Sequence, residues 1–596
     1  MKKNKEKKNK NTFANCVFML RQIWKYNPKF IIFTILEGTV YGVCYSLTTV
    51  VLIKTLYDKL ESGDFKATAL VVILTLVISS LASLYSYLFG WAVKQWYRQK
   101  LHIGMHSALY QKAMSLDLSC YDDPEFYNDF IWAINESDSR ASSIVEDLRI
   151  LISNAATTFT TLGLMFSVEP IAVIYSLAVA FVNTRSNLFF NKLWKTRSEE
   201  AQPNNRKMDY VTRALTLPEY AKEIRTGYAY DLLKAEYAKT IEEDKRISIK
   251  YGKKSLLWSN IFGAFQTVSE GAVYIYFAYR LFSGGITLGE YAAMTTIFWR
   301  LFWGFTTISR QFTKLSEHGL YAEKYRTFIE YEPKIKDGEK KAEKPEVIRF
   351  EDVSFRYPSN EEDTLHNVTF SINKGEKVAI VGYNGAGKTT LIKLLLRLYD
   401  PTEGTVTVNG EDIKNFSVDS YRENFGTVFQ DFQIFAATIA ENVVAGEYSP
   451  EMKERVLKAL SDATFENKLE KLEKGIDTPL TREFDDDGVN LSGGETQKIA
   501  IARVFAGERE VIVMDEPSSA LDPMSEYELN RTIMESAKDK TVIFISHRLS
   551  TTRMANRILM FAEGKLIEDG SHKELMALGG KYAEMFNMQA EKYNKS

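Results

Sequence analysis

The apolar runs in the first half of the chain restrict its fold more than any other feature. A helix rises about 1.5 Å per residue, so a run of about twenty apolar residues can cross roughly 30 Å of hydrocarbon. Six runs are candidates for such spans, and they occupy residues 30–53, 67–93, 148–168, 171–182, 256–282 and 291–308. The fourth run is the shortest. The sequence therefore predicts an all-α transmembrane domain of six helices in this half.

The polar segments between these runs indicate how the helices cross the membrane. Residues 94–147 and 187–254 are long and charged, so they cannot lie in lipid. Cytoplasmic loops carry an excess of lysine and arginine. The first segment has this excess, at Lys94, Arg98, Lys100 and Lys112. It is therefore expected in the cytoplasm, and counting crossings places the second segment and both termini there as well.

The N-terminus adds a basic tail and a short amphipathic helix. Six lysines fall within residues 2–10, and apolar residues follow at helical spacing from Phe13 to Trp24. Such a helix is expected to lie flat on the inner leaflet beside the tail. Membrane lipid is thus an expected partner. For the tail itself, a solvated segment that only sets the topology is favoured over specific lipid binding.

The second half of the chain begins with short strands near Lys344. A strand at 377–381 leads into a stretch that fits the strand, G-x-x-x-x-G-K-[ST], helix pattern of a phosphate-binding loop. The stretch consists of Gly382, Tyr383, Asn384, Gly385, Ala386, Gly387, Lys388 and Thr389, with Thr390 directly after it. The glycines let backbone N–H groups turn toward phosphate oxygens, while Lys388 reaches the terminal phosphates and Thr389 ligates Mg²⁺. The motif predicts an α/β P-loop NTPase domain with ATP and Mg²⁺ as cofactors.

Two adjacent carboxylates follow a second apolar strand at 511–514. An uninterrupted apolar strand is typical of the buried centre of a nucleotide-binding sheet. Asp515 is expected to hold Mg²⁺, and Glu516 is expected to act as the general base that polarises the attacking water. Without the phosphate-binding loop, a solvated pair of acids at a strand end would be the favoured interpretation.

Between these motifs lies Leu491-Ser492-Gly493-Gly494-Glu495, which closely resembles the LSGGQ signature of the ABC ATPase family. The resemblance implies that Ser492, Gly493 and Gly494 open a helix that contacts the ATP held by a second chain. It therefore implies a dimer of two half-transporters. Glu495 stands where the family usually has Gln, and residues 483–488 are unusually acidic, so both a homodimer and a heterodimer stay open.

The same resemblance implies roles for four further residues. Tyr357 would stack on adenine, although simple packing is the alternative. Gln430 would sense Mg²⁺ and the attacking water. Asp522 would contact the other chain, and His547 would touch the γ-phosphate rather than serve a purely structural role.

Six spans followed by one ATPase domain is the layout of ABC exporter half-transporters. The resemblance implies ATP-driven export by alternating access, with an amphipathic peptide, drug or lipid as substrate, in a cell membrane of bacterial type. It also implies that segments 121–128 and 217–225 dock on ATPase domains. The expected organisation is a cytoplasmic tail and interfacial helix, a transmembrane domain, a linker, a nucleotide-binding domain and a short tail, at 1–28, 29–325, 326–346, 347–590 and 591–596.

Two other functions compete with export. An importer built on the exporter fold is compatible with the sequence. A soluble ABC ATPase that acts on DNA or ribosomes is disfavoured by the six apolar runs. The 75 basic and 77 acidic residues give a net charge of −2, so nucleic acid is not an expected partner.

Charged residues inside the predicted spans suggest where a substrate would pass. A charge in a span costs roughly 2.5 to 3.5 kcal/mol, so it needs a partner or a water-filled cavity. Glu37 and Arg300 lie at matching depths in the first and sixth spans, and Glu270 lies in the fifth. We expect Glu37 and Arg300 to line or gate a substrate cavity. A static ion pair between them is the alternative.

Overall fold

The computed structural model describes residues 12–516, 523–545 and 549–594, and the chain divides into two compact units. The helical unit takes in the described residues of Met1–Met114 and Asn128–Tyr331. The α/β unit takes in Ser115–Tyr127 and the described residues of Glu332–Ser596. The predicted domains were each continuous in sequence, so the assignment of 115–127 to the α/β unit is a difference from that expectation.

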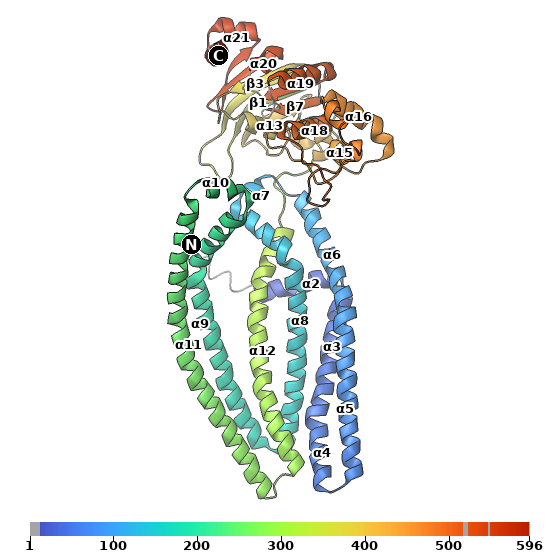
Figure 1. Ribbon diagram of the computed structural model, residues 1–596, viewed down its shortest axis with the longest axis vertical. Coiled ribbons are helices and arrows are strands. Elements are labelled where there is room, and N and C mark those ends of the chain that lie inside the picture. The colour runs from blue at the N-terminus through green and yellow to red at the C-terminus, as the bar shows by residue number, and fades with distance from the viewer. Residues whose placement is uncertain (1–11, 517–522, 546–548, 595–596) are drawn as a thin grey trace. The chain divides into compact units, whose positions relative to one another are not determined.

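The helical unit consists of long helices that run alongside one another (Figure 1). Its α-helices are α2 (Thr12–Tyr26), α3 (Pro28–Ser46), α4 (Leu52–Glu61), α5 (Phe65–Leu88), α6 (Lys94–Met114), α8 (Pro124–Val168), α9 (Pro170–Thr216), α10 (Ala221–Thr226), α11 (Ala229–Phe282) and α12 (Leu288–Ile329). Two π-helical turns, η1 (Leu47–Val51) and η2 (Phe89–Val93), join α3 to α4 and α5 to α6, and a 3₁₀ turn, η3 (Pro218–Tyr220), precedes α10. All six predicted spans thus fall inside helices.

Four of these helical stretches are long and apolar enough to cross a membrane by length and composition, among the described residues. They are Pro28–Glu61, Phe65–Met114, Asp129–Val168 and Pro170–Thr216. The fifth and sixth predicted spans lie in α11 and α12, which do not reach this level of apolarity. Polar residues such as Gln266, Glu270 and Arg300 within the two runs explain the difference.

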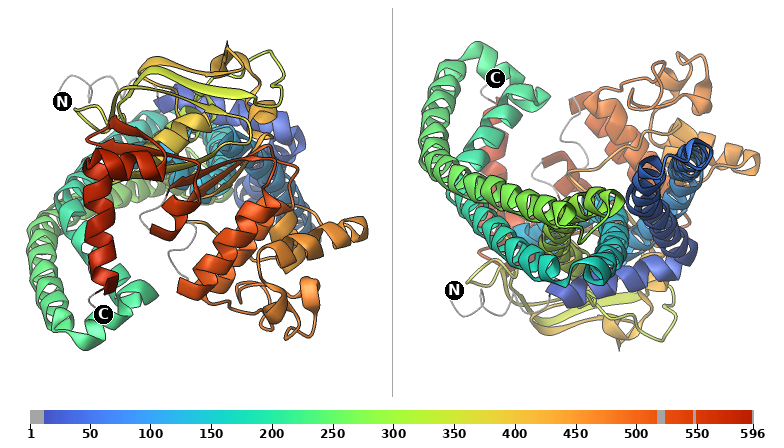
Figure 2. Two further views of the ribbon diagram at one scale, coloured as in Figure 1. Left: turned by 90° about the horizontal axis from the view of Figure 1, so that it is seen from above. Right: turned by 90° about the horizontal axis from the view of Figure 1, so that it is seen from below.

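Helix α2 lies across the direction of the long helices, as the view from below shows (Figure 2). It packs against α12, where the Cys16 thiol donates a hydrogen bond to the Leu315 carbonyl oxygen at 3.0 Å. Met19 and Ile23 on the same face are fully buried. One apolar stripe on a short helix therefore fixes α2 to the bundle.

The core of the helical unit lies between α9, α11 and α12. Phe277 of α11 and Ile297 and Leu301 of α12 have no exposed surface. Helix α12 starts with a capping box, in which Thr287 accepts from the backbone N–H of Glu290 and the Glu290 carboxylate accepts from that of Thr287.

The α/β unit contains two sheets. The antiparallel sheet has the order β2-β1-β4-β5, from strands β1 (Val347–Phe355), β2 (Leu365–Asn373), β4 (Glu403–Val408) and β5 (Glu411–Asp412). The second sheet has the order β10-β9-β3-β8-β7-β6, from β3 (Lys377–Gly382), β6 (Phe425–Val428), β7 (Val511–Asp515), β8 (Thr541–Ile545), β9 (Arg557–Ala562) and β10 (Lys565–Gly570). Strands β3, β6, β7, β8 and β9 are mutually parallel, and β10 pairs antiparallel with β9.

Short helices complete the α/β unit. They are α7 (Ser119–Asp122), α13 (Lys388–Leu395), α14 (Val418–Arg422), α15 (Ile439–Val444), α16 (Lys453–Asp462), α17 (Glu466–Leu469), α18 (Gly493–Phe505), α19 (Pro523–Ser536), α20 (Leu549–Met554), α21 (His572–Leu578) and α22 (Lys581–Asn594), with 3₁₀ turns η4 (Ile413–Asn415), η5 (Pro450–Met452) and η6 (Gly475–Asp477). Helices α15, α18 and α21 start with the same capping box as α12. Because β3, β7 and β8 are parallel and wholly buried, the segments that follow them meet at one edge of the sheet.

Candidate functional site

The loop after β3 has the backbone that a phosphate-binding loop requires. Gly385 and Gly387 adopt φ values of +82° and +93°, in the left-handed region that favours glycine. A Cβ on Gly387 would lie 2.5 Å from the Leu365 Cδ2 atom. Gly387 also caps α13, so the positive end of that helix faces the loop.

Lys388 is folded back onto this loop. Its buried ammonium donates to the carbonyl oxygens of Gly382 and Tyr383, at 2.9 and 3.0 Å. Burial lowers the pKa of Lys388, although the nearby charges of Glu516 and Asp515 act in the opposite direction. The ammonium therefore lies at the mouth of the loop, where a terminal phosphate would replace the carbonyl partners.

Thr389 and Asp515 form the candidate magnesium site. The Thr389 hydroxyl donates to the Asp515 Oδ2 atom at 3.1 Å. Burial raises the pKa of Asp515 to about 6, helped by the neighbouring charge of Glu516 and opposed by the Thr389 hydrogen bond. A buried carboxylate beside a hydroxyl, both offering oxygen atoms, is the ligand chemistry that Mg²⁺ prefers, so these residues fit the cation.

Glu516 and Gln430 lie together beside that pair. The Gln430 side-chain amide donates to the Glu516 Oε2 atom at 3.2 Å. Glu516 has a φ of +51°, which is unusual for a residue with a side chain, and its N–H bonds to the Ile545 carbonyl oxygen at 3.0 Å. Strained backbone of this kind is typical of catalytic positions.

These groups surround a pocket of about 410 Å³. Its lining combines the loop with the strand-end residues, namely Thr364, Asn384, Gly385, Ala386, Gly387, Lys388, Thr389, Thr390, Gln430 and Glu516. Thr364 was not predicted from the sequence, because it precedes β2 and no motif marks it. Its carbonyl oxygen lies 3.2 Å from where a Cβ of Gly387 would be.

Tyr357 lies beside the pocket and not in its lining. Its hydroxyl is 3.1 Å from the Thr390 Oγ1 atom, and its ring packs edge-on against Phe355 and Tyr399. The ring is partly exposed, so both adenine stacking and the packing alternative stay predictions. Tyr383 is 47% exposed and likewise does not line the pocket.

The signature residues open α18. Ser492 and Glu495 form a capping box: the Ser492 N–H donates to the Glu495 carboxylate at 2.8 Å, and the Glu495 N–H donates to the Ser492 hydroxyl at 3.4 Å. The Lys468 ammonium pairs with the same carboxylate at 2.9 Å. Ser492 and Gly493 are exposed, and neither they nor Gly494 and Glu495 line the pocket of this chain. The predicted Asp522 and His547 lie outside the described residues.

Of the three charged residues predicted for the substrate cavity, Glu37, Glu270 and Arg300, only Arg300 lines a cavity. A cavity of about 760 Å³ in the helical unit is lined by Arg300 and Arg149, but not by Glu37 or Glu270. Glu37 is buried and accepts hydrogen bonds from Arg149 at 3.3 Å and Ser86 at 2.5 Å. No ion pair joins Glu37 to Arg300 among the described residues, so the static-pair alternative is wrong. Matching depth along two helices does not fix the direction in which each side chain points.

Arg300 and Glu270 have different surroundings. The Arg300 guanidinium lies over the Tyr45 ring, 4.3 Å from its centroid. Its Nη1 atom is buried and has no hydrogen-bond partner among the residues that the structure describes. Glu270 accepts a hydrogen bond from the Tyr274 hydroxyl at 2.9 Å. Arg149 was missed in the sequence because it stands at the entry of an apolar run, where arginine is common.

Segment 115–127 packs within the α/β unit, as the resemblance implied for 121–128. The Asp117 carboxylate accepts backbone N–H groups of Lys334 and Ile335 at 2.7 and 3.2 Å. The Tyr399 hydroxyl donates to the Asp122 carboxylate, and Leu118 packs against the core of the two sheets. Segment 217–225 groups instead with the helical unit.

A P-loop site on a parallel sheet, in a chain that also carries long apolar helices, defines an ATP-dependent membrane transporter. Residues 365–519 match the family model described as "ABC transporter". The subtilin transport ATP-binding protein SpaT of Bacillus subtilis is 31% identical over 513 residues, which cover 83% of this chain and 81% of that protein. The ATP-dependent lipid A-core flippase of Pasteurella multocida is 39% identical over 242 residues, covering 41% of each chain.

The solved structure of a bacterial Atm1-family ABC exporter with ATP bound shares the fold, with a TM-score of 0.73, 23% identity and coverage of 96% of this chain and 99% of that one. The chain belongs to the ABC transporter family, and it is an ATPase whose activity drives export. The predicted exporter fold, a helical membrane domain followed by an α/β nucleotide-binding domain, is confirmed.

Proposed function

We propose that the chain is one half of a dimeric exporter that hydrolyses ATP with Mg²⁺ and moves an amphipathic molecule bearing an anionic group. The guanidinium of Arg300 has no carboxylate partner among the described residues and lines a cavity rich in aromatic and hydroxyl side chains, and this observation carries the substrate class.

The loop residues and Lys388 would hold the ATP phosphates. Their backbone geometry and positive helix end supply oriented dipoles, and Lys388 would exchange its two carbonyl partners for phosphate oxygens. Thr389 and Asp515, with the Gln430 amide oxygen, would hold Mg²⁺. The cation, when bound, neutralises charge that develops on the phosphates during hydrolysis.

Glu516 would act as the general base for the attacking water. Its carboxylate is positioned by the hydrogen bond from Gln430, and its backbone is fixed by the bond to Ile545. Both constraints orient the carboxylate before substrate arrives. Such pre-organisation favours proton abstraction because little rearrangement is needed at the moment of reaction.

Two exposed surfaces of this chain support the proposal of a second half-transporter. Ser492 and Gly493 present a hydroxyl and a helix start to solvent, outside their own chain's pocket. The stretch around α10 exposes apolar side chains, with Tyr228 90% and Leu232 71% accessible. Exposed apolar residues of this kind mark protein contacts. The second chain would be a copy of this one or a different half-transporter.

The cavity beside Arg300 would take the substrate. Arg149 in the same cavity is already paired with Glu37 and Glu146, whereas the described residues that line the cavity near Arg300 include no carboxylate. Most of the remaining wall consists of hydroxyl and aromatic side chains, among them Tyr41, Tyr45, Thr157, Trp299 and Trp303. A guanidinium without a counter-ion attracts a carboxylate or phosphate, and the rings accept an apolar body.

The orientation proposed for the protein follows the basic residues of the sequence. The tail, both termini and the nucleotide-binding domain would lie in the cytoplasm of a bacterial cell, with α2 on the inner leaflet. The crosswise direction of α2 supports this position.

The proposal is tested with the full chain purified and reconstituted in lipid. We expect Mg²⁺-dependent ATP hydrolysis by a dimer, recorded with native mass on the same sample. A monomer with little turnover would indicate that a different chain completes the ATP sites. Hydrolysis should be stimulated by an anionic amphiphile, such as a fatty acid, and much less by its uncharged methyl ester.

Arg300→Met should abolish the preference for the acid. Arg310→Met is the matched control, because Arg310 lies on the same helix and is exposed. Equal stimulation by acid and ester in the unmodified protein would contradict the anionic substrate class without affecting the ATPase assignment.

A further inference from the structure

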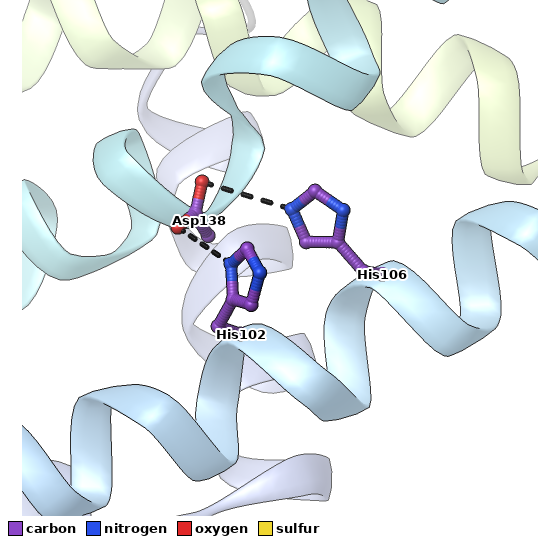
Figure 3. Close-up of side chains that lie close together, drawn as sticks. All are labelled: His102, His106 and Asp138. Atoms are coloured by element: carbon purple, nitrogen blue, oxygen red, sulfur yellow. Dashed lines mark hydrogen bonds and ion pairs between the residues drawn. The ribbon is translucent and has the colours of Figure 1, made fainter. Parts of the chain in front are cut away.

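Two histidines and an aspartate meet in the helical unit, away from every residue used above (Figure 3). His102 and His106 lie one turn apart on α6 and point toward Asp138 of α8. The His102 Nδ1 atom is 2.9 Å from Asp138 Oδ2, and the His106 Nε2 atom is 3.8 Å from Asp138 Oδ1. One ligand atom from each residue lies within 4.8 Å of the other two.

The pair of imidazoles is not explained by hydrogen bonding alone. The His106 Nε2 atom is buried and has no hydrogen-bond partner among the described residues. The two ring centroids are 4.1 Å apart, so both rings are held against each other beside one carboxylate. A buried polar atom left unsatisfied costs about 1–3 kcal/mol, and a cation shared by the three groups removes this cost.

The ligand set selects the kind of cation. Zinc binds imidazole nitrogen and carboxylate oxygen at about 2.0–2.2 Å in tetrahedral geometry, which puts neighbouring ligand atoms roughly 3.3 Å apart. The two distances from an imidazole nitrogen to an Asp138 oxygen, 2.9 Å for His102 and 3.8 Å for His106, lie on either side of this value. Mg²⁺ and Ca²⁺ prefer oxygen ligands, so two imidazoles argue against them.

We propose that His102, His106 and Asp138 form a binding site for a divalent transition-metal ion, with zinc as the best fit and water in the fourth position. The ion would join α6 to α8. Helix α6 ends at Met114 and α8 begins at Pro124, so residues 115–123 connect the two helices that the ion would join.

The test measures metal on the full-length chain, purified in detergent and stripped with a chelator. Equilibrium dialysis against zinc, without ATP or Mg²⁺, should give one zinc per chain with micromolar affinity, and Co²⁺ should give the visible absorption of a tetrahedral nitrogen and oxygen site. Zinc should also raise the melting temperature. His106→Gln and Asp138→Asn should each weaken binding at least about tenfold.

Two variants serve as controls. Glu136→Gln removes a carboxylate from α8 close to Asp138, and His366→Gln removes a histidine of the α/β unit; both should keep the zinc. His102→Gln adds a test at a side chain that is half exposed, where loss of binding does not reflect misfolding. Retention of zinc in all three site variants would assign the metal to other groups, such as the cysteine thiols, and would overturn the proposal. Failure of the unmodified protein to bind zinc would also overturn the proposal.

Discussion

The Tyr399 hydroxyl donates a hydrogen bond to the carboxylate of Asp122, and this contact joins segment 115–127 to the nucleotide-binding sheets. Tyr399 is 5% exposed, and burial raises the pKa of its phenol, with a further contribution from the Asp122 charge. The phenol therefore stays protonated and keeps donating throughout the physiological pH range.

Replacing Tyr399 by phenylalanine should loosen this segment without disturbing the ATP pocket. The ring would still pack against Phe355 and Tyr357, and Asp122 is exposed enough to be solvated, so the loss in stability should be about 1 kcal/mol. Hydrogen exchange of 115–127 should accelerate, while basal ATP hydrolysis changes little and its stimulation by substrate falls. Unchanged protection of the segment would refute a docking role for this hydrogen bond.

Glu516→Gln should remove ATP hydrolysis but not ATP binding. A general base contributes about 10²- to 10⁴-fold to a rate, and glutamine keeps the shape and the contact to Gln430. Phosphate release and equilibrium binding of labelled ATP are the two measurements. Glu508→Gln, an exposed carboxylate of the same unit, is the control and should hydrolyse ATP like the unmodified protein. Comparable turnover in both variants would exclude Glu516 as the base.

Gly387→Ala should prevent ATP binding because it combines backbone strain with a collision. The φ of +93° and the 2.5 Å approach to Leu365 should together cost about 1–3 kcal/mol and displace the loop. Gly410→Ala is a matched control, since Gly410 has a φ of +83° but nothing within 4 Å of the added Cβ. That variant should lose about 1 kcal/mol and bind ATP normally. Calorimetry with ATP and thermal unfolding separate the two effects.

Glu495→Gln should leave ATP hydrolysis nearly unchanged. Glutamine can accept the Ser492 N–H as glutamate does, so only the ion pair with Lys468 is lost, and a pair this exposed is worth about 0–1 kcal/mol. Burial raises the pKa of Glu495, but hydrogen bonds from Ser492 and Lys468 outweigh it and hold the pKa below its usual range, so the carboxylate is charged at neutral pH. A large fall in turnover would show that this charge acts beyond the helix cap.

Glu37→Gln should weaken the helical unit and spare substrate recognition. The variant removes one partner of Arg149, which keeps Glu146, so we expect a loss of about 1–3 kcal/mol. Glu61→Gln at the exposed end of α4 should have no effect on thermal unfolding. Loss of substrate-stimulated ATPase in Glu37→Gln, with folding intact, would restore the original expectation that Glu37 gates the cavity.

The nucleotide-binding residues could be predicted because their chemistry is local. Gly385, Gly387, Lys388 and Thr389 are adjacent in sequence, and a strand followed by a glycine loop and a helix has few conformations. Placing Asp515 and Glu516 beside the loop also requires the inference that their strand runs parallel to β3, because parallel strands end at a common edge of the sheet. Thr364 contributes to the same pocket through the tertiary fold alone, and no local pattern revealed it.

The helical unit was less predictable because its contacts depend on helix rotation. Residue counting gave similar depths for Glu37 and Arg300, yet the partner of Glu37 is Arg149 on α8. Likewise, no shift in composition marks 115–127 as part of the α/β unit. Its membership depends on side chains such as Asp117 that bond to segments more than 200 residues away.

The capping box of Ser492 and Glu495 has a consequence for assembly. The same arrangement begins α12, α15 and α21, so in this chain it is a general device for starting helices. At α18 it fixes the signature backbone while the chain is still alone. The conformational entropy of that turn is therefore lost during folding. Association with a second chain then carries no further entropic cost for ordering the turn, which favours tighter binding.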